Sequence, residues 1–261
     1  MILFSHAKIN IGLYVTSKRA DGFHNIESVF YPIPFYDLIE LLPYEKDVFS
    51  TSGLEIPPGP NLVQEAYELL KKDFKLGKTF IHLHKRIPLG SGLGGGSSNA
   101  AFTLMGLNYL YDLGLSKEQL MDYAAQLGSD CPFFIQDHPC LVKGRGEIME
   151  AIDLDLSGFY LKLIHTGIHV STPMAYRFIQ PNNRSLHINF LSDYNPFKND
   201  FEEVVFGMHP ELKVIKEKLL QEGAFYASMT GSGSAIYGLF ENKPAKTGGY
   251  LFEEIMELKQ P

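Results

Sequence analysis

Cysteine, excess basic charge and long apolar runs are all scarce in this sequence of 261 residues. Its two cysteines, Cys131 and Cys140, do not form a Cys-x-x-Cys pair, so neither a disulfide scaffold nor a zinc ribbon is indicated. The formal net charge of -7 argues against a nucleic-acid-binding protein, which would carry a basic stripe. No apolar run reaches the roughly 18 residues of a membrane span, and the first residues lack the basic and apolar regions of a signal peptide. We therefore expect a cytoplasmic protein with no membrane and no nucleic-acid partner.

Glycine, in contrast, is abundant. The chain holds 24 glycines, whereas the usual share of about 7% would give roughly 18. Charge is also unevenly distributed, because residues 1–100 carry 10 acidic and 10 basic side chains and the whole negative excess lies in residues 101–261. An anionic ligand would therefore bind more readily to the first part of the chain.

Strand-like and helix-like segments are mixed along the whole chain. Apolar alternation predicts strands at 4–15, 23–35, 79–86, 159–164, 225–228 and 235–240, and helical periodicity predicts helices at 61–74, 97–111, 116–127, 210–220 and 250–258. Asn61 and a capping box of Ser116 and Gln119 would begin two of these helices. The mixture indicates an α/β or α+β protein with two domains, which we place at residues 1–153 and 154–261. A polar surface loop is expected at 181–185.

A segment with five glycines lies between a predicted strand and a predicted helix. We call residues 88–98 the first glycine loop; it comprises Pro88, Leu89, Gly90, Ser91, Gly92, Leu93, Gly94, Gly95, Gly96, Ser97 and Ser98. Glycines let successive backbone amides point into one concavity, and the start of a helix adds free amides and a positive dipole end. The segment therefore favours phosphate binding over a simple connecting turn.

Two other phosphate-binding motifs fit this segment poorly. Gly90, Gly92 and Gly95 satisfy G-x-G-x-x-G, but a dinucleotide-binding fold needs that pattern in its first βαβ unit, with an acid about 20 residues later on a strand tip. The protein-kinase pattern fails because no H-R-D or D-F-G motif follows. Residues Met229–Ala235, which we call the second glycine loop, lie between two predicted strands. This loop is either a hairpin turn or the second half of a clamp on the same ligand.

Three segments together resemble, in order and spacing, the signature motifs of the GHMP small-molecule kinase superfamily. They are residues 7–13 (AKINIGL), the first glycine loop and residues 230–235 (TGSGSA). Residues 19–25 (RADGFHN) and 127–134 (LGSDCPFF) further resemble a member that acts on a cytidine diphosphate sugar alcohol. The resemblance covers nearly the whole chain. It implies an α+β fold with an N-terminal α/β domain containing a left-handed βαβ crossover, and a smaller ferredoxin-like C-terminal domain.

The resemblance implies transfer of the γ-phosphoryl group of ATP to a hydroxyl group. That reaction needs a cradle for the triphosphate, a cation for the developing charge, and a group that orients or deprotonates the hydroxyl. The resemblance assigns this last role to Asp130, with Lys8 beside it and Asn10 near the transferred phosphate or the acceptor. From the residues alone, Asp130 is more commonly a turn or cap residue, Lys8 a solvated strand lysine, and Asn10 a structural residue at a strand end.

The resemblance also implies two sets of binding residues. For ATP it implies the first glycine loop with Asn61 and Lys85, for which a helix cap and a strand-end surface charge are the alternatives. For the second substrate it implies Asn10, Phe23, His24, Thr172, Tyr176, Gly231, Ser232 and Gly233. Phe23 and His24 would contact a cytosine on one side, with Tyr176 as the opposite wall, because stacking needs only a flat ring. Ordinary core packing is the alternative for each aromatic residue.

Cofactors and partners follow from the same resemblance. We expect ATP with Mg2+, held mainly by phosphate oxygens and by Ser97 or Ser98, since no His-x-x-x-His on a helix and no carboxylate pair at ligand spacing is present. The expected partners are small-molecule substrates, and the chain would be a monomer or a homodimer.

Two other functions stay open. One is another kinase of the superfamily, such as a homoserine or mevalonate kinase, which the cytidine-recognition element at 21–24 (DGFH) disfavours. The other is a catalytically inactive nucleotide or sugar sensor, because a shared fold does not guarantee activity. Retention of both Asp130 and Lys8 disfavours that second alternative.

Overall fold

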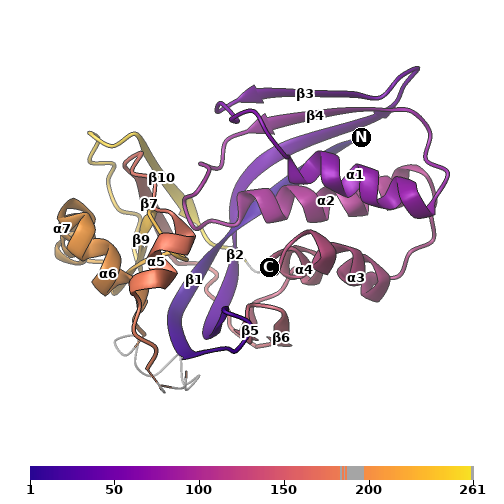
Figure 1. Ribbon diagram of the computed structural model, residues 1–261. Coiled ribbons are helices and arrows are strands. Elements are labelled where there is room, and N and C mark those ends of the chain that lie inside the picture. Colours follow the sequence, from indigo (N-terminus) through magenta and orange to yellow (C-terminus); the bar gives the residue numbers. More distant parts are fainter. Residues whose placement is uncertain (183, 185, 187–196, 260–261) are drawn as a thin grey trace. The chain divides into compact units, whose positions relative to one another are not determined.

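The computed structural model describes residues 1–182, 184, 186 and 197–259, which divide into two compact units (Figure 1). Unit 1 comprises residues 1–7, 35–89 and 94–137, and unit 2 comprises residues 8–34, 90–93 and 138–261. The two long N-terminal strands, β1 (Ile2–Lys18) and β2 (His24–Pro43), contribute residues to both units. A domain boundary at residues 153 and 154 stays a prediction, and residues 183 and 185 of the expected surface loop lie outside the described residues.

The sheet of unit 1 is built around β4 (Thr79–Lys85). This strand runs parallel to β3 (Val48–Gly53) and antiparallel to the C-terminal part of β2, from Leu38↔His84 to Pro43↔Thr79. Every second residue of β4 is buried, as the alternation predicts. Helix α1 (Leu62–Asp73) joins β3 to β4 and makes a parallel crossover. The left-handed sense of this crossover stays a prediction.

Four helices complete unit 1, and two of them begin where the capping residues predict. The Asn61 side chain accepts the Val63 N–H at 2.9 Å at the start of α1, and the Ser116–Gln119 capping box is present at α3 (Lys117–Leu127). Helix α2 (Gly95–Leu110) lies beside α1 and starts two residues earlier than predicted, after Gly94 in the left-handed conformation. Helix α4 (Cys131–Gln136) was not predicted, because six residues are too few to show a helical period.

Unit 2 contains an antiparallel sheet in the order β10-β7-β9-β8. Its strands are β7 (Tyr160–His165), β8 (Tyr226–Met229), β9 (Ile236–Phe240) and β10 (Phe252–Glu257), and its helices are α5 (Thr172–Phe178), α6 (Phe201–Met208) and α7 (Pro210–Gln221). Their apolar faces meet in a core that includes Leu13, Phe201, Leu212, Met229 and Ile236. A hairpin of β5 (Cys140–Lys143) and β6 (Ile148–Ala151) pairs with β2 at residues 28–30. Among the described residues, no helix is long and apolar enough to cross a membrane.

The segment before the C-terminus is a strand, so the helix predicted at 250–258 is wrong. β10 pairs along the whole of β7, from Phe252↔His165 to Glu257↔Tyr160. Glutamate and methionine favour a helix locally, but pairing with β7 satisfies the backbone and overrides that preference. It also brings Glu253 Oε1 to 3.1 Å from Nζ of Lys162, whose side chain is 0% exposed. A buried ammonium needs such a partner, which a surface helix would not supply.

Candidate active site

Lys8 and Asn10 lie next to each other on one face of β1, inside unit 2. Lys8 is 3% exposed and Asn10 is 2% exposed, so Lys8 is not a solvated surface lysine. Its ammonium donates to Asn10 Oδ1 and lies 4.5 Å from the centre of the Phe30 ring. Asn10 Nδ2 in turn donates to Ser28 Oγ at 2.9 Å. A buried cation needs such partners, so these contacts fix the position of the Lys8 ammonium.

The two glycine loops touch each other within unit 2. The Ala235 N–H donates to the Ser91 carbonyl at 3.1 Å, and Thr230 Oγ1 lies 3.1 Å from the Gly92 carbonyl. Gly92 has a φ of +80°, and a Cβ at this position would lie 2.0 Å from the Thr230 carbonyl oxygen. Only glycine allows this approach, because it has no Cβ and adopts positive φ without strain. The backbone of residues 90–93 is therefore shaped by the second glycine loop.

The second glycine loop also reaches Asn10. The Asn10 N–H donates to Thr230 Oγ1 at 3.1 Å, and the Tyr237 hydroxyl donates to the Asn10 carbonyl at 2.6 Å. At its tip, Ser232 Oγ lies 2.7 Å from Thr172 Oγ1. The predicted substrate residues Asn10, Thr172 and Ser232 are thus linked through one loop.

The remaining part of the first glycine loop begins α2 in unit 1. Gly94 precedes the helix with a φ of 72°, and no acidic side chain lies in the first turn. The amides of this turn point out of the helix with the positive end of its dipole, as an anion site requires. Ser98 is 0% exposed and its Oγ has no hydrogen-bond partner among the described residues, whereas Ser97 is half-buried.

Asp130 lies at the start of α4 in unit 1, directly before Cys131. It is the N-cap residue but makes no side-chain cap hydrogen bond, and it is half-buried. Burial raises the pKa of the Cys131 thiol to about 12, a hydrogen bond with Ser97 opposes that rise, and the charge of Asp130 adds to it. Ser97 and Cys131 therefore bring the first turn of α2 beside the carboxylate of Asp130.

Lys85 is buried as well, at 2% exposed, so it is not a strand-end surface charge. Its ammonium pairs with Asp37, a buried carboxylate that also accepts the N–H groups of Arg86 at 2.6 Å and Ile87 at 2.8 Å. Asn99 Nδ2 donates to the same carboxylate at 3.0 Å. Burial lowers the pKa of Lys85 below its usual value, and the charge of Asp37 opposes that change. This network fixes the end of β4 against α2.

Two of the aromatic residues predicted to hold a base contact each other directly. Tyr176 stacks on His24, with ring centroids 5.1 Å apart and an interplanar angle of 22°. Phe23 is 53% exposed, and the Arg145 guanidinium lies 4.3 Å from its ring centre. Burial, followed by the charge of Lys18, lowers the pKa of His24, so its ring is neutral at neutral pH. Unit 2 thus contains a His24–Tyr176 ring stack and a separate contact of Arg145 with Phe23.

The structure sorts the predicted site residues between the two units. Unit 2 holds Lys8, Asn10, Phe23, His24, Gly90, Ser91, Gly92, Leu93, Thr172, Tyr176, Gly231, Ser232 and Gly233, and unit 1 holds Asn61, Lys85, Pro88, Leu89, Gly94, Gly95, Gly96, Ser97, Ser98 and Asp130. Sequence reasoning missed Ser28 and Asp37, which support Asn10 and Lys85. A single polar residue within a strand gives no signal of burial, because such residues usually face solvent.

Known proteins that this chain resembles share its architecture over nearly its full length. The models for the GHMP kinases N terminal domain and the GHMP kinases C terminal domain match residues 61–138 and 179–247. The chain is 45% identical to a 4-diphosphocytidyl-2-C-methyl-D-erythritol kinase of Azobacteroides pseudotrichonymphae, covering 97% of this chain and 98% of that protein. It is 47% identical to the Bacteroides thetaiotaomicron protein of the same name, covering 92% of each.

Solved structures agree with this likeness. A crystal structure of a 4-(cytidine 5'-diphospho)-2C-methyl-D-erythritol kinase superposes with a TM-score of 0.80 at 32% identity, covering 92% of this chain and 90% of that chain. The Methanococcus jannaschii mevalonate kinase superposes with a TM-score of 0.64 at 15% identity, covering 92% of this chain and 90% of that chain, which shows a common fold alone.

Proposed function

Because the chain belongs to the GHMP kinase superfamily, and within it to the 4-diphosphocytidyl-2-C-methyl-D-erythritol kinases, we propose a role for each candidate residue in the kinase reaction. The enzyme transfers a phosphoryl group from ATP to the 2-hydroxyl of this substrate in the non-mevalonate route to isoprenoid precursors. The main observation in support of these roles is that Lys8 is buried against Asn10, which is held by the second glycine loop. A cytoplasmic location and a monomeric or homodimeric state are further proposals.

The first glycine loop binds the phosphates of ATP. Its glycines leave backbone amides accessible to an anion, and its last residues form the amide-rich start of α2. Backbone N–H groups suit this task because they bind anions without adding a mobile side chain. Asn61 and Lys85 stay predicted ATP residues, although the Asn61 side chain caps α1 and Lys85 pairs with Asp37.

Mg2+ would enter with the nucleotide. When bound it would neutralise the charge that develops on the phosphate oxygens. The described residues contain no cluster of three His, Cys, Asp or Glu side chains, so we assign the ion to phosphate oxygens with Ser97 as the protein oxygen. Ser97 suits this role better than Ser98, because the Ser98 hydroxyl is fully buried.

Asp130 is the group that accepts the proton of the substrate 2-hydroxyl as the new oxygen–phosphorus bond forms. Asp130 lies at the start of α4, and a carboxylate is a side chain that can accept the proton of a hydroxyl. Lys8 supplies positive charge for the transferred group, and Asn10 orients Lys8 through its side-chain oxygen. The protein needs no nucleophile of its own, because positioning and charge stabilisation are the main sources of catalysis in phosphoryl transfer.

The aromatic group of unit 2 receives the cytosine. His24 and Tyr176 are too close for a base to lie between them, since each stacked contact needs about 3.5 Å. We therefore assign the base to the open face of Phe23, opposite Arg145, with His24 and Tyr176 forming the adjoining wall. Thr172 and the second glycine loop, through Ser232, would contact the rest of the substrate.

Replacing Asp130 with asparagine tests the assignment of the base. The amide cannot accept the proton, so we expect turnover to fall by about 100-fold or more, while the Kd for an ATP analogue changes little. Asp137→Asn is the matched control, because Asp137 ends the same six-residue helix and is 62% exposed. Wild-type turnover in Asp130→Asn would remove Asp130 from the mechanism.

A coupled ADP-release assay tests the substrate. We expect activity with the cytidylated substrate and none with homoserine or mevalonate. Activity only with one of the latter would contradict the proposed acceptor, and inactivity with all three would favour a binding protein.

A further inference from the structure

The segment that enters α6 connects β1 to the second glycine loop. Leu13 on β1 donates its N–H to the Lys198 carbonyl at 2.9 Å, and the Asp200 N–H donates to the Leu13 carbonyl at 2.8 Å. Asp200 Oδ2 then accepts the Val15 N–H at 2.8 Å. Residues 198–200 are thereby fixed to the same strand that carries Lys8 and Asn10.

Asn199, between these anchors, clamps the second glycine loop. It is 3% exposed, and its Nδ2 donates to the Met229 carbonyl at 2.7 Å and to the Gly231 carbonyl at 2.8 Å. Its Oδ1 accepts the Phe201 N–H at 3.0 Å, so both ends of the amide are engaged. Two carbonyls held by one side chain fix the curvature of a loop that glycine would otherwise leave free.

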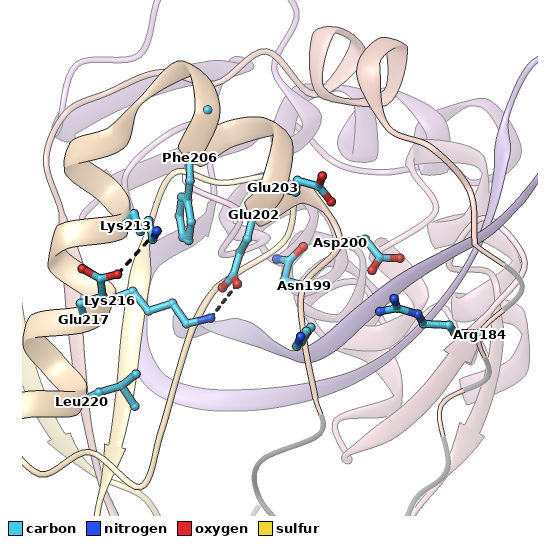
Figure 2. Close-up of a pocket in the computed structure, with 12 residues that line it drawn as sticks. Arg184, Asn199, Asp200, Glu202, Glu203, Phe206, Lys213, Lys216, Glu217 and Leu220 are labelled. Atoms are coloured by element: carbon cyan, nitrogen blue, oxygen red, sulfur yellow. Dashed lines mark hydrogen bonds and ion pairs between the residues drawn. The ribbon is translucent and has the colours of Figure 1, made fainter.

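Glu202 supports the start of the same loop from the next turn. Its carboxylate is buried and accepts the Met229 N–H at 2.9 Å, the Ser228 hydroxyl at 3.1 Å and the Lys216 ammonium at 2.6 Å. Figure 2 shows Lys216 extending to Glu202 beside Asn199, along a cavity of about 760 Å³. The cavity leaves room on one side of Asn199 and Glu202, so a substitution of similar size causes no clash.

We propose that Asn199 is a positioning residue for phosphoryl transfer, with Glu202 as its second support. Asn199 holds the loop so that Thr230 lies against Asn10 and Gly92 at the same time. Neither Asn199 nor Glu202 touches the reacting groups in this assignment. The inference rests on the proposed function, because the loop matters for catalysis only if Asn10 and the first glycine loop do.

Asn199→Asp is the sharpest perturbation, because it keeps the size of the side chain and its Oδ1 while it replaces the donor by an anion facing two carbonyls. Asn108→Asp is the matched control. Asn108 clamps Leu115 in unit 1 through its Nδ2 and Oδ1, at 3.1 and 3.0 Å. Both variants lose a comparable clamp, and only Asn199 lies at the second glycine loop.

The first readout is hydrogen exchange without substrate, followed at the amides of Thr230, Gly233 and Ala235, which make the hydrogen bonds of the loop. We expect Asn199→Asp to exchange about tenfold faster there, with the β7–β9 amides unchanged, and Asn108→Asp to leave all of them unchanged. The second readout is kinetic. We expect kcat to fall by about tenfold to 100-fold and the KM for ATP to rise by only about threefold, because the loop shapes residues 90–93 while the amides of α2 keep their positions.

A kcat of Asn199→Asp within about twofold of wild type would overturn the proposal. Exchange that becomes equally faster at the amides that pair β7 with β9 would also overturn it. If Asn199→Asp does not fold, Glu202→Gln replaces it, since this variant keeps one oxygen for the Met229 N–H but loses the attraction of Lys216. We expect faster exchange at Met229 and a lower kcat in it, and unchanged values of both would overturn the proposal. Failure of the proposed function is distinguishable, because it appears as wild-type inactivity and does not affect the exchange result.

Discussion

Gly92→Ala should separate the two glycine loops. The new Cβ would lie 2.0 Å from the Thr230 carbonyl oxygen, whereas Cβ atoms essentially never lie closer than 3.0 Å to another residue's heavy atoms. One backbone must therefore move by about 1 Å. A displacement of this size in a catalytic site costs about 100-fold in rate. The positive φ of Gly92 adds a conformational cost of about 1 to 2 kcal/mol for alanine, which affects stability.

Gly114→Ala separates these two effects. Gly114 has a φ of +68°, and a Cβ there would meet nothing within 4 Å. The control should therefore lose only about 1 to 2 kcal/mol of unfolding free energy and keep its turnover. Urea unfolding measures the stability of both variants, and coupled ADP release measures their kcat. Turnover of Gly92→Ala within about threefold of Gly114→Ala would refute the argument that the contact between the loops sets the geometry of the phosphate site.

Two further predictions concern ionisation. Burial alone would raise the pKa of Glu253, but the amides of Thr247 and Gly248 and the Lys162 ammonium lower it to about 2. A lowered folded-state pKa stabilises the fold at pH values above the pKa of the unfolded chain, and this stabilisation is lost as pH falls. The unfolding free energy of wild type should therefore exceed that of Glu253→Gln by about 3 kcal/mol above about pH 5 and by roughly half of that at pH 3. Urea unfolding at both pH values measures this difference, and a difference independent of pH would contradict the assignment. Because burial holds the Cys131 pKa at about 12, we expect iodoacetamide at about pH 8 to modify this thiol only in the unfolded chain, as peptide mass spectrometry would show.

Features encoded within a few residues could be predicted from the sequence. Asn61 and the Ser116–Gln119 pair begin their helices as expected, because a capping residue satisfies amides only two or three positions away. The same holds for the glycine loops, because the first lies between β4 and α2 and the second between β8 and β9, as their flanking residues predict. The helix expected at 250–258 failed because the deciding partner, β7, lies far away in the sequence.

The environments of the candidate site residues could not be predicted from the sequence. Nothing near Lys8 or Lys85 in the sequence signals burial, because the ring of Phe30 and the carboxylate of Asp37 come from other strands. Asn199 carried no signal at all, since its two acceptors are backbone carbonyls, which every residue has. Side-chain identity can be read from a motif, whereas the contacts that tune it depend on tertiary pairing.

The hydrogen bonds that shape residues 90–93 join parts of the chain that are synthesised far apart in time. Thr230 meets the Gly92 carbonyl across 138 residues, and it meets the Asn10 N–H across 220 residues. Closing such long loops has an entropic cost that precedes any reward from the contacts. A chain growing from its N-terminus therefore carries the first glycine loop long before it carries the support for that loop. A nascent chain that ends before Met229 therefore has the glycine motif of residues 90–93 without the hydrogen bonds that fix its geometry.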